Sequence, residues 1–116
     1  MIDGALLLDK PLGVSSNAAL QRAKKLLGAT KAGHAGTLDP LASGLLVTLF
    51  GEATKFAGPL LDADKEYLAT LKLGERTSTG DAEGDVVSKK DINTDNLPAV
   101  LERFRGEIEQ VPPMHS

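Results

Sequence analysis

At 116 residues and 12.2 kDa, with 41% apolar and 25% charged residues, the chain suits a single globular domain and is too apolar to be disordered. The absence of cysteine excludes disulfides and thiolate metal sites, and no apolar stretch reaches the ~18 residues that a membrane span needs, so we expect a cytoplasmic protein without a membrane partner. The net charge of −3 argues against wholesale nucleic-acid binding. The charge is uneven, because residues 1–58 carry +2 and residues 59–116 carry −5, so any RNA-facing surface is expected in the first half. The alternative is that these charges only form ordinary solvated faces.

The first half of the chain is predicted to hold two strands and two helices around a long loop. An apolar run ends in the turn-forming residues Lys10-Pro11-Leu12-Gly13, which indicates a buried strand. The helix that follows can be capped by Ser15 or Ser16 at its start and by Gly28 at its end. In order, the expected elements are a strand at 5–8, a helix to residue 27, a loop at 30–40, a central strand at 45–50 and a short helix at 52–58.

The second half is predicted to be richer in strands. Residues 66–73 alternate in chemistry, which places Tyr67 on one face of a strand. A polar loop at 77–85, a strand at 85–88, a helix from 94 or 96 to 104 and a last strand at 106–111 complete the order. We therefore predict an α+β fold with a largely antiparallel sheet and flanking helices.

The segment 33–40, GHAGTLDP, stands out because it places an acid and an imidazole on a glycine-broken loop. Its glycines allow backbone angles closed to other residues, while Pro40 fixes its own φ and biases Asp39 toward an extended conformation. Asp39 is therefore expected to be presented to a partner. Taken alone, however, an acid before a proline is more often an ordinary turn residue.

Other patterns for chemistry are incomplete. The glycines near Lys55 lack the spacing and the hydroxyl residue of a P-loop. The acids at 62–66 and 81–85 lack the glycine and the glutamate of a calcium loop, and are expected to be solvated. The two histidines are too far apart to indicate a zinc site, and no serine, histidine and aspartate set stands out.

Four motifs together carry a resemblance to a known family. They are LDKPLGVSS at 8–16, GHAGTLDPLASGLL at 33–46, GEATK at 51–55 and KEY at 65–67, with further matches at Gly74, Thr77, Thr79, Gly80, Asp81, Gly84 and 110–114. In order and spacing they resemble the bacterial TruB-type tRNA pseudouridine synthases. Each motif alone is a weak signal, and the combination is specific. The resemblance runs from about Gly4 to the end of the chain.

The resemblance implies isomerisation of one T-loop uridine of tRNA, at position 55, to pseudouridine. It places the family's catalytic aspartate on Asp39, which fits the ability of a carboxylate to act as nucleophile, base or charge stabiliser at a sugar carbon. Because the base must leave its stack, His34 is expected to occupy the vacated space. Tyr67, the only tyrosine, is expected to stack on the uracil and is a candidate to assist proton removal from C5. Without the resemblance, His34 would be interpreted as a solvated loop imidazole, and Tyr67 would be interpreted as an ordinary aromatic residue of a strand.

The same resemblance assigns supporting roles. Lys10 and Pro11 would border the site and brace the tyrosine, and Lys55 suits a phosphate or a structural ion pair, although surface lysines are usually only solvated. Gly36 and Thr37 would support the loop. Asp81 would help position a catalytic arginine. No cofactor and no metal are expected, and the partner would be the tRNA T stem-loop, bound by a protein that is monomeric when complete.

The family continues well past the proline pair at 112–113, where it contributes that arginine and usually a small C-terminal RNA-binding domain. The resemblance therefore implies that residues 1–116 are the N-terminal portion of the catalytic domain, which would leave sheet edges or apolar surface uncovered. Two alternatives stay open. The chain could be a tRNA-binding module that remodels the T arm without chemistry, or a folding unit that is inert without the rest of its chain. The sequence also leaves open whether Asp39 attacks C1′, attacks the pyrimidine ring or promotes a glycal intermediate.

Overall fold

The computed structural model describes residues 2–112, which divide into two compact units between Glu66 and Tyr67. Each unit is described by itself. The last part of the motif at 110–114 and His115 lie outside the described residues. Within residues 2–112, no helix is both long enough and apolar enough to cross a membrane.

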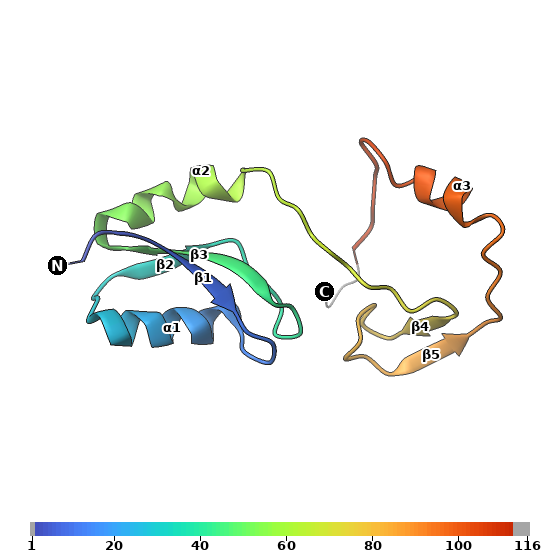
Figure 1. Cartoon of the computed structure of the whole chain (residues 1–116), viewed down its shortest axis with the longest axis horizontal. Helices are drawn as coiled ribbons and strands as arrows, with labels where there is room; N and C mark the ends of the chain where they lie inside the picture. Colours follow the sequence, from blue (N-terminus) through green and yellow to red (C-terminus); the bar gives the residue numbers. More distant parts are fainter. Residues whose placement is uncertain (1, 113–116) are drawn as a thin grey trace. The chain divides into compact units, whose positions relative to one another are not determined.

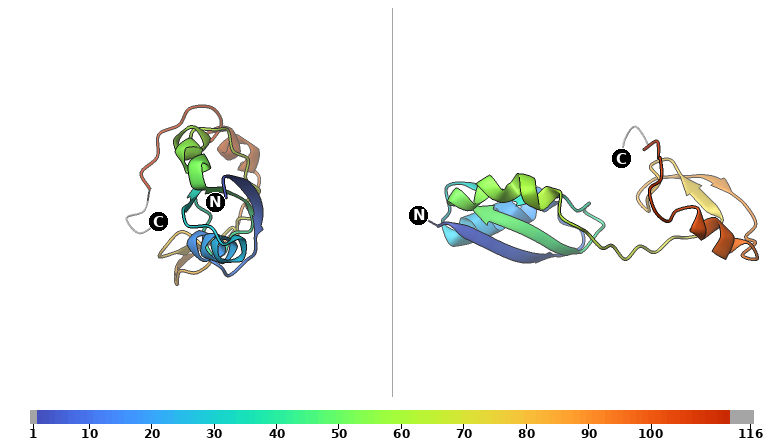
Figure 2. Two further views of the ribbon diagram at one scale, coloured as in Figure 1. Left: turned by 90° about the vertical axis from the view of Figure 1, so that its left-hand side faces the viewer. Right: turned by 90° about the horizontal axis from the view of Figure 1, so that it is seen from above.

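The first unit is a three-stranded antiparallel sheet with helical segments on both faces (Figure 1). The strand order is β1-β3-β2, and β3 pairs with both neighbours. The turned views in Figure 2 show α1 on one face of the sheet and the η1–α2 segment on the other. The bounds are β1 Gly4–Lys10, α1 Ser16–Leu27, β2 Ala32–Ala35, β3 Gly44–Phe50, η1 Gly51–Phe56, a 3-10 helix, and α2 Ala57–Leu61.

The ends of α1 are fixed by the residues that the sequence marks as caps. Ser15 is the N-cap, because its hydroxyl accepts a hydrogen bond from the amide of Ala18 at 3.0 Å. Gly28 has a φ of 63°, in the left-handed region that favours glycine at a helix end. Both caps were expected. Of the two candidates for the N-cap, Ser15 and Ser16, the N-cap is Ser15.

The core lies between α1 and the sheet. Leu20 and Ala23 of α1 pack with Phe50 of β3, and all three are nearly inaccessible. Leu46 and Leu49 of β3 are also buried, at 1% and 2% exposed, which confirms β3 as the central strand. Burial of each such leucine or phenylalanine contributes about 1.5–3 kcal/mol, so α1 and β3 dominate the stability of this unit.

One correction concerns the predicted loop at 30–40. Its first part is the strand β2, in which His34 lies opposite Thr48 of β3. Glycine and alanine have low strand propensity, so the local pattern does not indicate a strand. The hydrogen-bonded ladder with β3 outweighs that propensity, and His34 is held by a sheet rather than by a free loop.

The second unit is a short hairpin followed by a helix. Its elements are β4 Glu75–Thr77, β5 Val86–Lys89 and α3 Leu97–Glu102, with β4 and β5 antiparallel. β5 and α3 match the expected elements, whereas β4 does not follow from the alternation pattern. Of the residues described between 67 and 112, none is buried.

Two predicted strands of the second half are wrong. The described residues at 66–73 and 106–111 form no ladder, and their apolar side chains are exposed, as Leu71 is at 76% and Val111 at 96%. An alternation of apolar and polar residues suits a strand with one buried face. A strand forms, however, only where a neighbouring strand satisfies its amides and carbonyls. The antiparallel α+β class is nevertheless confirmed by both sheets.

Gly51 gives a direct test of the first unit. Its φ is 61°, and a Cβ there would collide with the Asp3 carboxylate and the Ile2 carbonyl. We expect Gly51→Ala to lower the free energy of unfolding by about 2–4 kcal/mol in urea denaturation. Gly58→Ala is the matched control, because Gly58 lies in α2 with no heavy atom near its virtual Cβ, and should be neutral or stabilising by up to about 1 kcal/mol. Equal losses for the two variants would contradict this account.

Candidate active site

The Asp39 segment connects β2 to β3 and is tied to the connection between β1 and α1. Figure 1 shows the two connections at the same end of the sheet. The amide of Gly13 donates to the carbonyl of Pro40 at 2.7 Å. This bond joins residues that are far apart in the sequence, so the position of Asp39 depends on the whole first unit and not on its own loop alone.

Lys10, the last residue of β1, is fully buried. Its ammonium group donates to the carbonyls of Val14 at 2.7 Å and Pro11 at 2.9 Å, with a longer contact of 3.5 Å to Pro40. Three acceptors match the three donors of the group, which is what a buried charge requires. The predicted contact of Lys10 with RNA or substrate does not fit this burial, because the ammonium group has no accessible surface.

Ser16, the first residue of α1, holds the peptide before Asp39. Its hydroxyl accepts from the amide of Leu38 and donates to the carbonyl of Leu38, both at 2.8 Å. The side chain is 2% exposed, and its single hydrogen and one lone pair are both used. The sequence marks Ser16 only as a possible helix cap, because nothing in it signals a partner at Leu38.

Asp39 itself is exposed, as expected of a presented acid. Its carbonyl accepts from the amide of Ala42 at 2.9 Å, which closes a turn over residues 39–42. Pro40 is the second residue of that turn, a position that its fixed φ favours. Asp39 can therefore be both a turn residue and a functional acid, since the turn uses its backbone carbonyl and leaves its carboxylate exposed to solvent.

His34 is half-buried on β2 and bonded to the beginning of the loop. Its Nδ1 lies 2.5 Å from the carbonyl of Gly36, and because a carbonyl only accepts, Nδ1 carries the hydrogen. Nε2 is then the ring atom left for another partner. Gly36 has a φ of 86°, which permits the turn beneath the ring, and Thr37 is exposed beside it.

Lys55 and Pro11 are exposed on the first unit. Lys55 lies on η1 and forms an ion pair with Glu52 one turn earlier. Both side chains are about two-thirds exposed, at 69% and 65%, so water and salt screen the pair and it contributes at most about 1 kcal/mol. Lys55 is therefore available to exchange its carboxylate partner for another anion.

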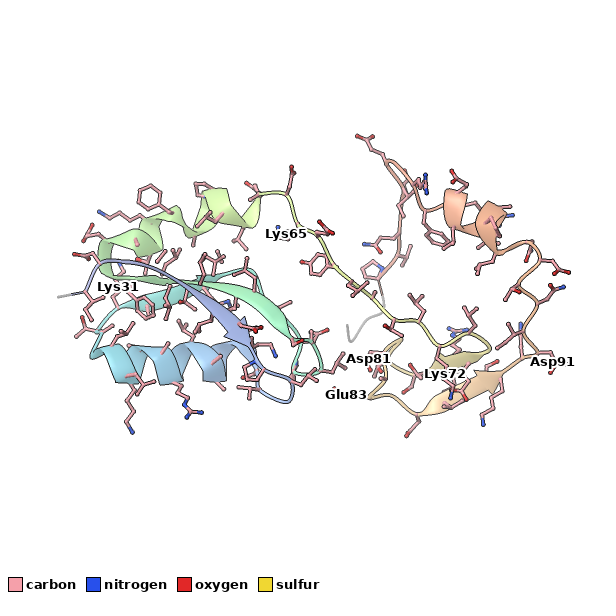
Figure 3. The ribbon with its side chains drawn as sticks, viewed as in Figure 1. Lys31, Lys65, Lys72, Asp81, Glu83 and Asp91 are labelled. Atoms are coloured by element: carbon pink, nitrogen blue, oxygen red, sulfur yellow. The ribbon has the colours of Figure 1, made fainter. Side chains whose placement is uncertain are left out.

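Tyr67 and Asp81 belong to the second unit. Tyr67 lies in an extended stretch without a strand and is 69% exposed. Asp81, labelled in Figure 3, organises the β4–β5 loop. Its Oδ1 accepts from the hydroxyl of Thr79 at 2.6 Å and from the amides of Glu83 and Gly84 at 2.9 and 3.2 Å. The Thr79 hydroxyl lowers the pKa of Asp81 most, and the Glu83 and Gly84 amides lower it further, while burial opposes them.

The structure thus brings together the Lys10 and Asp39 segments in the first unit, and it places Tyr67 and Asp81 in the second. Residues 2–112 contain no group of three or more histidines, aspartates or glutamates that could hold a metal ion. The distinctive geometry is a solvent-exposed carboxylate on a turn whose flanking peptides are bonded to buried side chains.

Comparisons with known proteins agree with this architecture. The family model for the TruB family pseudouridylate synthase, N-terminal domain, matches residues 24–116. The chain belongs to this family. The matched range includes Asp39, His34 and residues of both compact units, while Lys10 and Ser16 lie ahead of it.

Curated relatives extend the match to nearly the whole chain. A tRNA pseudouridine synthase B from Cupriavidus pinatubonensis is 64% identical over 99% of this chain and 37% of its own length. The protein of the same name from Burkholderia mallei is 65% identical, over 99% of this chain and 39% of its own length. The chain therefore spans less than two-fifths of the length of these relatives.

A solved structure is also similar over nearly the whole chain. One chain in the crystal structure of a Cbf5-Nop10-Gar1 complex is similar to this chain with a TM-score of 0.68 and 33% sequence identity. The match covers 97% of this chain and 30% of that one. The similar region therefore includes residues of both compact units.

The Asp81 contacts predict a pH dependence of stability. A carboxylate whose pKa is lowered by folding stabilises the folded state above the unfolded pKa, near 3.8, and loses that contribution as pH falls through the folded pKa. We expect Asp81→Asn to be less stable than the parent at pH 7, and the difference to shrink below about pH 4. Urea denaturation at pH 7, 5 and 3 measures it.

Thr79→Val supplies the control for this effect, because it removes the hydroxyl that lowers the Asp81 pKa most. The acid-dependent part of the parent's stability should decrease in this variant. A constant difference between parent and Asp81→Asn at all three pH values would show that the carboxylate charge plays no part in holding the loop.

Proposed function

We propose that this chain supplies the catalytic aspartate of a tRNA pseudouridine synthase that converts the T-loop uridine at position 55 to pseudouridine. The observation that carries the proposal is the exposed Asp39 on a turn whose neighbouring peptides are held by Ser16, Gly13 and Lys10. Membership of the pseudouridylate synthase family and relatives named tRNA pseudouridine synthase B support the reaction class.

The reaction is an isomerisation, so it needs no redox cofactor. The N1–C1′ bond of uridine breaks, the uracil turns, and a C5–C1′ bond forms, while C5 loses a proton and N1 gains one. Electron deficiency develops at C1′ when the first bond breaks, and a carboxylate at this carbon stabilises it as a nucleophile or as a counter-charge. An exposed carboxylate on a fixed backbone meets this requirement, because the turn supplies the position and the carboxylate is accessible to the sugar carbon.

The need to flip the base out of its stack gives His34 and Tyr67 their proposed roles. A T-loop uridine is stacked in the folded tRNA, and its extrusion costs a few kcal/mol that replacement contacts must offset. His34 offers a flat ring with Nε2 free for a hydrogen bond, since Nδ1 is bonded to Gly36. Tyr67 is the only tyrosine of the chain and is 69% exposed, so its ring is accessible for stacking on the uracil.

The remaining residues take supporting roles. Lys55 is an exposed cation on the positively charged half of the chain and suits a phosphate of the T stem-loop. Lys10 holds the Asp39 turn from inside through the carbonyl of Pro40, and Pro11 supplies another acceptor for the Lys10 ammonium group. Gly36 and Thr37 shape the start of the turn. Asp81 would orient an arginine supplied by the part of the relatives that lies beyond this chain's match. In this proposal the protein acts as a monomer in the cytoplasm.

Asp39→Asn tests the catalytic role. We expect at least an about 10³-fold loss of pseudouridine formation, because the amide is neither a nucleophile nor a charge partner. The assay follows release of tritium from C5-labelled uridine in tRNA, with this chain joined to the remaining length of the Burkholderia mallei relative. Asp62→Asn is the matched control, since Asp62 is an exposed acid just after α2, and it should leave the rate within about twofold.

The same variant separates catalysis from the non-catalytic alternative. A module that only remodels the T arm would retain its effect on tRNA folding in Asp39→Asn and would release no tritium in the parent. Parent-like tritium release by Asp39→Asn would reject Asp39 as the reacting carboxylate.

Tyr67 is tested by two substitutions. Tyr67→Phe keeps the ring and removes the hydroxyl, so kcat should fall while the KM for tRNA changes little. Tyr67→Leu also removes the stacking surface, whose contribution of about 1–3 kcal/mol per base predicts a further loss of roughly 5- to 150-fold in kcat/KM. Equal kinetics for the parent and Tyr67→Leu would exclude Tyr67 from the base-binding site.

A further inference from the structure

Ser16 has a pair of hydrogen bonds that helix formation does not require. The N-cap of α1 is Ser15, whose hydroxyl accepts from Ala18 at 3.0 Å. The hydroxyl of Ser16 instead bonds across the chain to both polar atoms of Leu38, each at 2.8 Å. Two adjacent serines therefore have different tasks, one local to the helix and one directed at the residue before Asp39.

The contact leaves the Leu38 peptide little freedom. A hydroxyl that accepts from the amide and donates to the carbonyl of one residue fixes that residue's backbone at two points. Ser16 is 2% exposed, so water does not compete for these bonds. The Leu38 carbonyl belongs to the peptide group whose nitrogen is that of Asp39, and its orientation sets the direction from which the Asp39 side chain leaves the backbone.

The other side of Asp39 is fixed separately. The carbonyl of Pro40 accepts from the amide of Gly13, and the turn over residues 39–42 is closed by the amide of Ala42. These donors are main-chain amides, which remain after substitution by any residue other than proline. Ser16 is thus the side chain through which the first half of the Asp39 turn can be loosened without a change in any charge.

We propose that Ser16 is a positioning residue for Asp39, acting through the Leu38 peptide and making no contact with the tRNA. This inference rests on the proposed function, because it concerns the placement of the same carboxylate. Loss of the hydroxyl would let the Leu38 peptide rotate and move the carboxylate by a fraction of an ångström or more. Small displacements of a reacting group reduce the rate of the chemical step and leave binding of the remote substrate surface unchanged.

The test compares Ser16→Ala with Ser15→Ala in this chain joined to the remainder of the Burkholderia mallei relative. We expect Ser16→Ala to lower kcat for pseudouridine formation by about 10- to 100-fold with an unchanged KM for tRNA. Ser15→Ala removes the helix cap and should lower the melting temperature, while kcat measured well below that temperature stays within about twofold of the parent. Ser16→Thr, which keeps the hydroxyl, should recover most of the kcat.

The possible outcomes separate this inference from the proposed function. Equal kcat for Ser16→Ala and the parent, or equal losses for Ser16→Ala and Ser15→Ala, would overturn the positioning role while a large effect of Asp39→Asn leaves the proposed function in place. Failure of Asp39→Asn to reduce activity would reject the proposed function itself. If Ser16→Ala does not fold, Ser16→Thr decides: a folded variant with parent-like kcat supports the inference, and a folded variant with kcat reduced more than about tenfold overturns it.

Discussion

The hydrogen bonds between the β1–α1 connection and the Asp39 turn are the constraint on which the candidate site depends. Ser16 holds Leu38, and Gly13 and Lys10 hold Pro40, so the peptides on both sides of Asp39 are fixed by residues 10–16. Every one of these bonds uses main-chain atoms of the turn. The carboxylate of Asp39 is consequently left free for a substrate, while the backbone on both sides of it is held by hydrogen bonds.

The burial of Lys10 has a cost that the fold must offset. An ammonium group taken out of water loses several kcal/mol of hydration, and only complete pairing makes this tolerable. The carbonyls of Pro11, Val14 and Pro40 provide that pairing and come from two separate connections. A basic side chain that would suit an RNA phosphate is thus used within the protein, which leaves exposed cations such as Lys55 for electrostatic contacts with RNA.

The sequence predicts most of the first unit, and in the second unit it predicts β5 and α3 but also two strands that do not form. The α1 helix was predictable from its apolar periodicity and from the caps Ser15 and Gly28, and β3 was predictable from its continuous apolar run, which is largely buried. The strand β2 was not predictable, since its small residues become a strand only through the β3 ladder. In the second unit, alternation at 66–73 indicates a strand, but the described chain provides no ladder partner there.

The candidate site shows the same division. The family motifs indicate Asp39, His34 and Tyr67 as candidate site residues, because these residues lie in distinctive local sequence context. The role of Ser16 depends on Leu38, 22 residues away, and no local pattern indicates such a pairing. The sequence motif indicates Lys10 as a candidate site residue. That its side chain points into the fold rather than toward RNA follows only from the positions of three carbonyl groups.

Native-state hydrogen exchange of the 116-residue chain measures the central claim most directly. Two amides report on the anchoring contacts: the amide of Leu38 donates to the Ser16 hydroxyl, and the amide of Gly13 donates to the Pro40 carbonyl. If the Asp39 turn is held as described, both amides should be protected to within about tenfold of the central amides of β3, because they open only when the first unit opens. Exchange of Leu38 and Gly13 at the rate of an unprotected loop amide would show that the turn is not anchored, and would contradict the account.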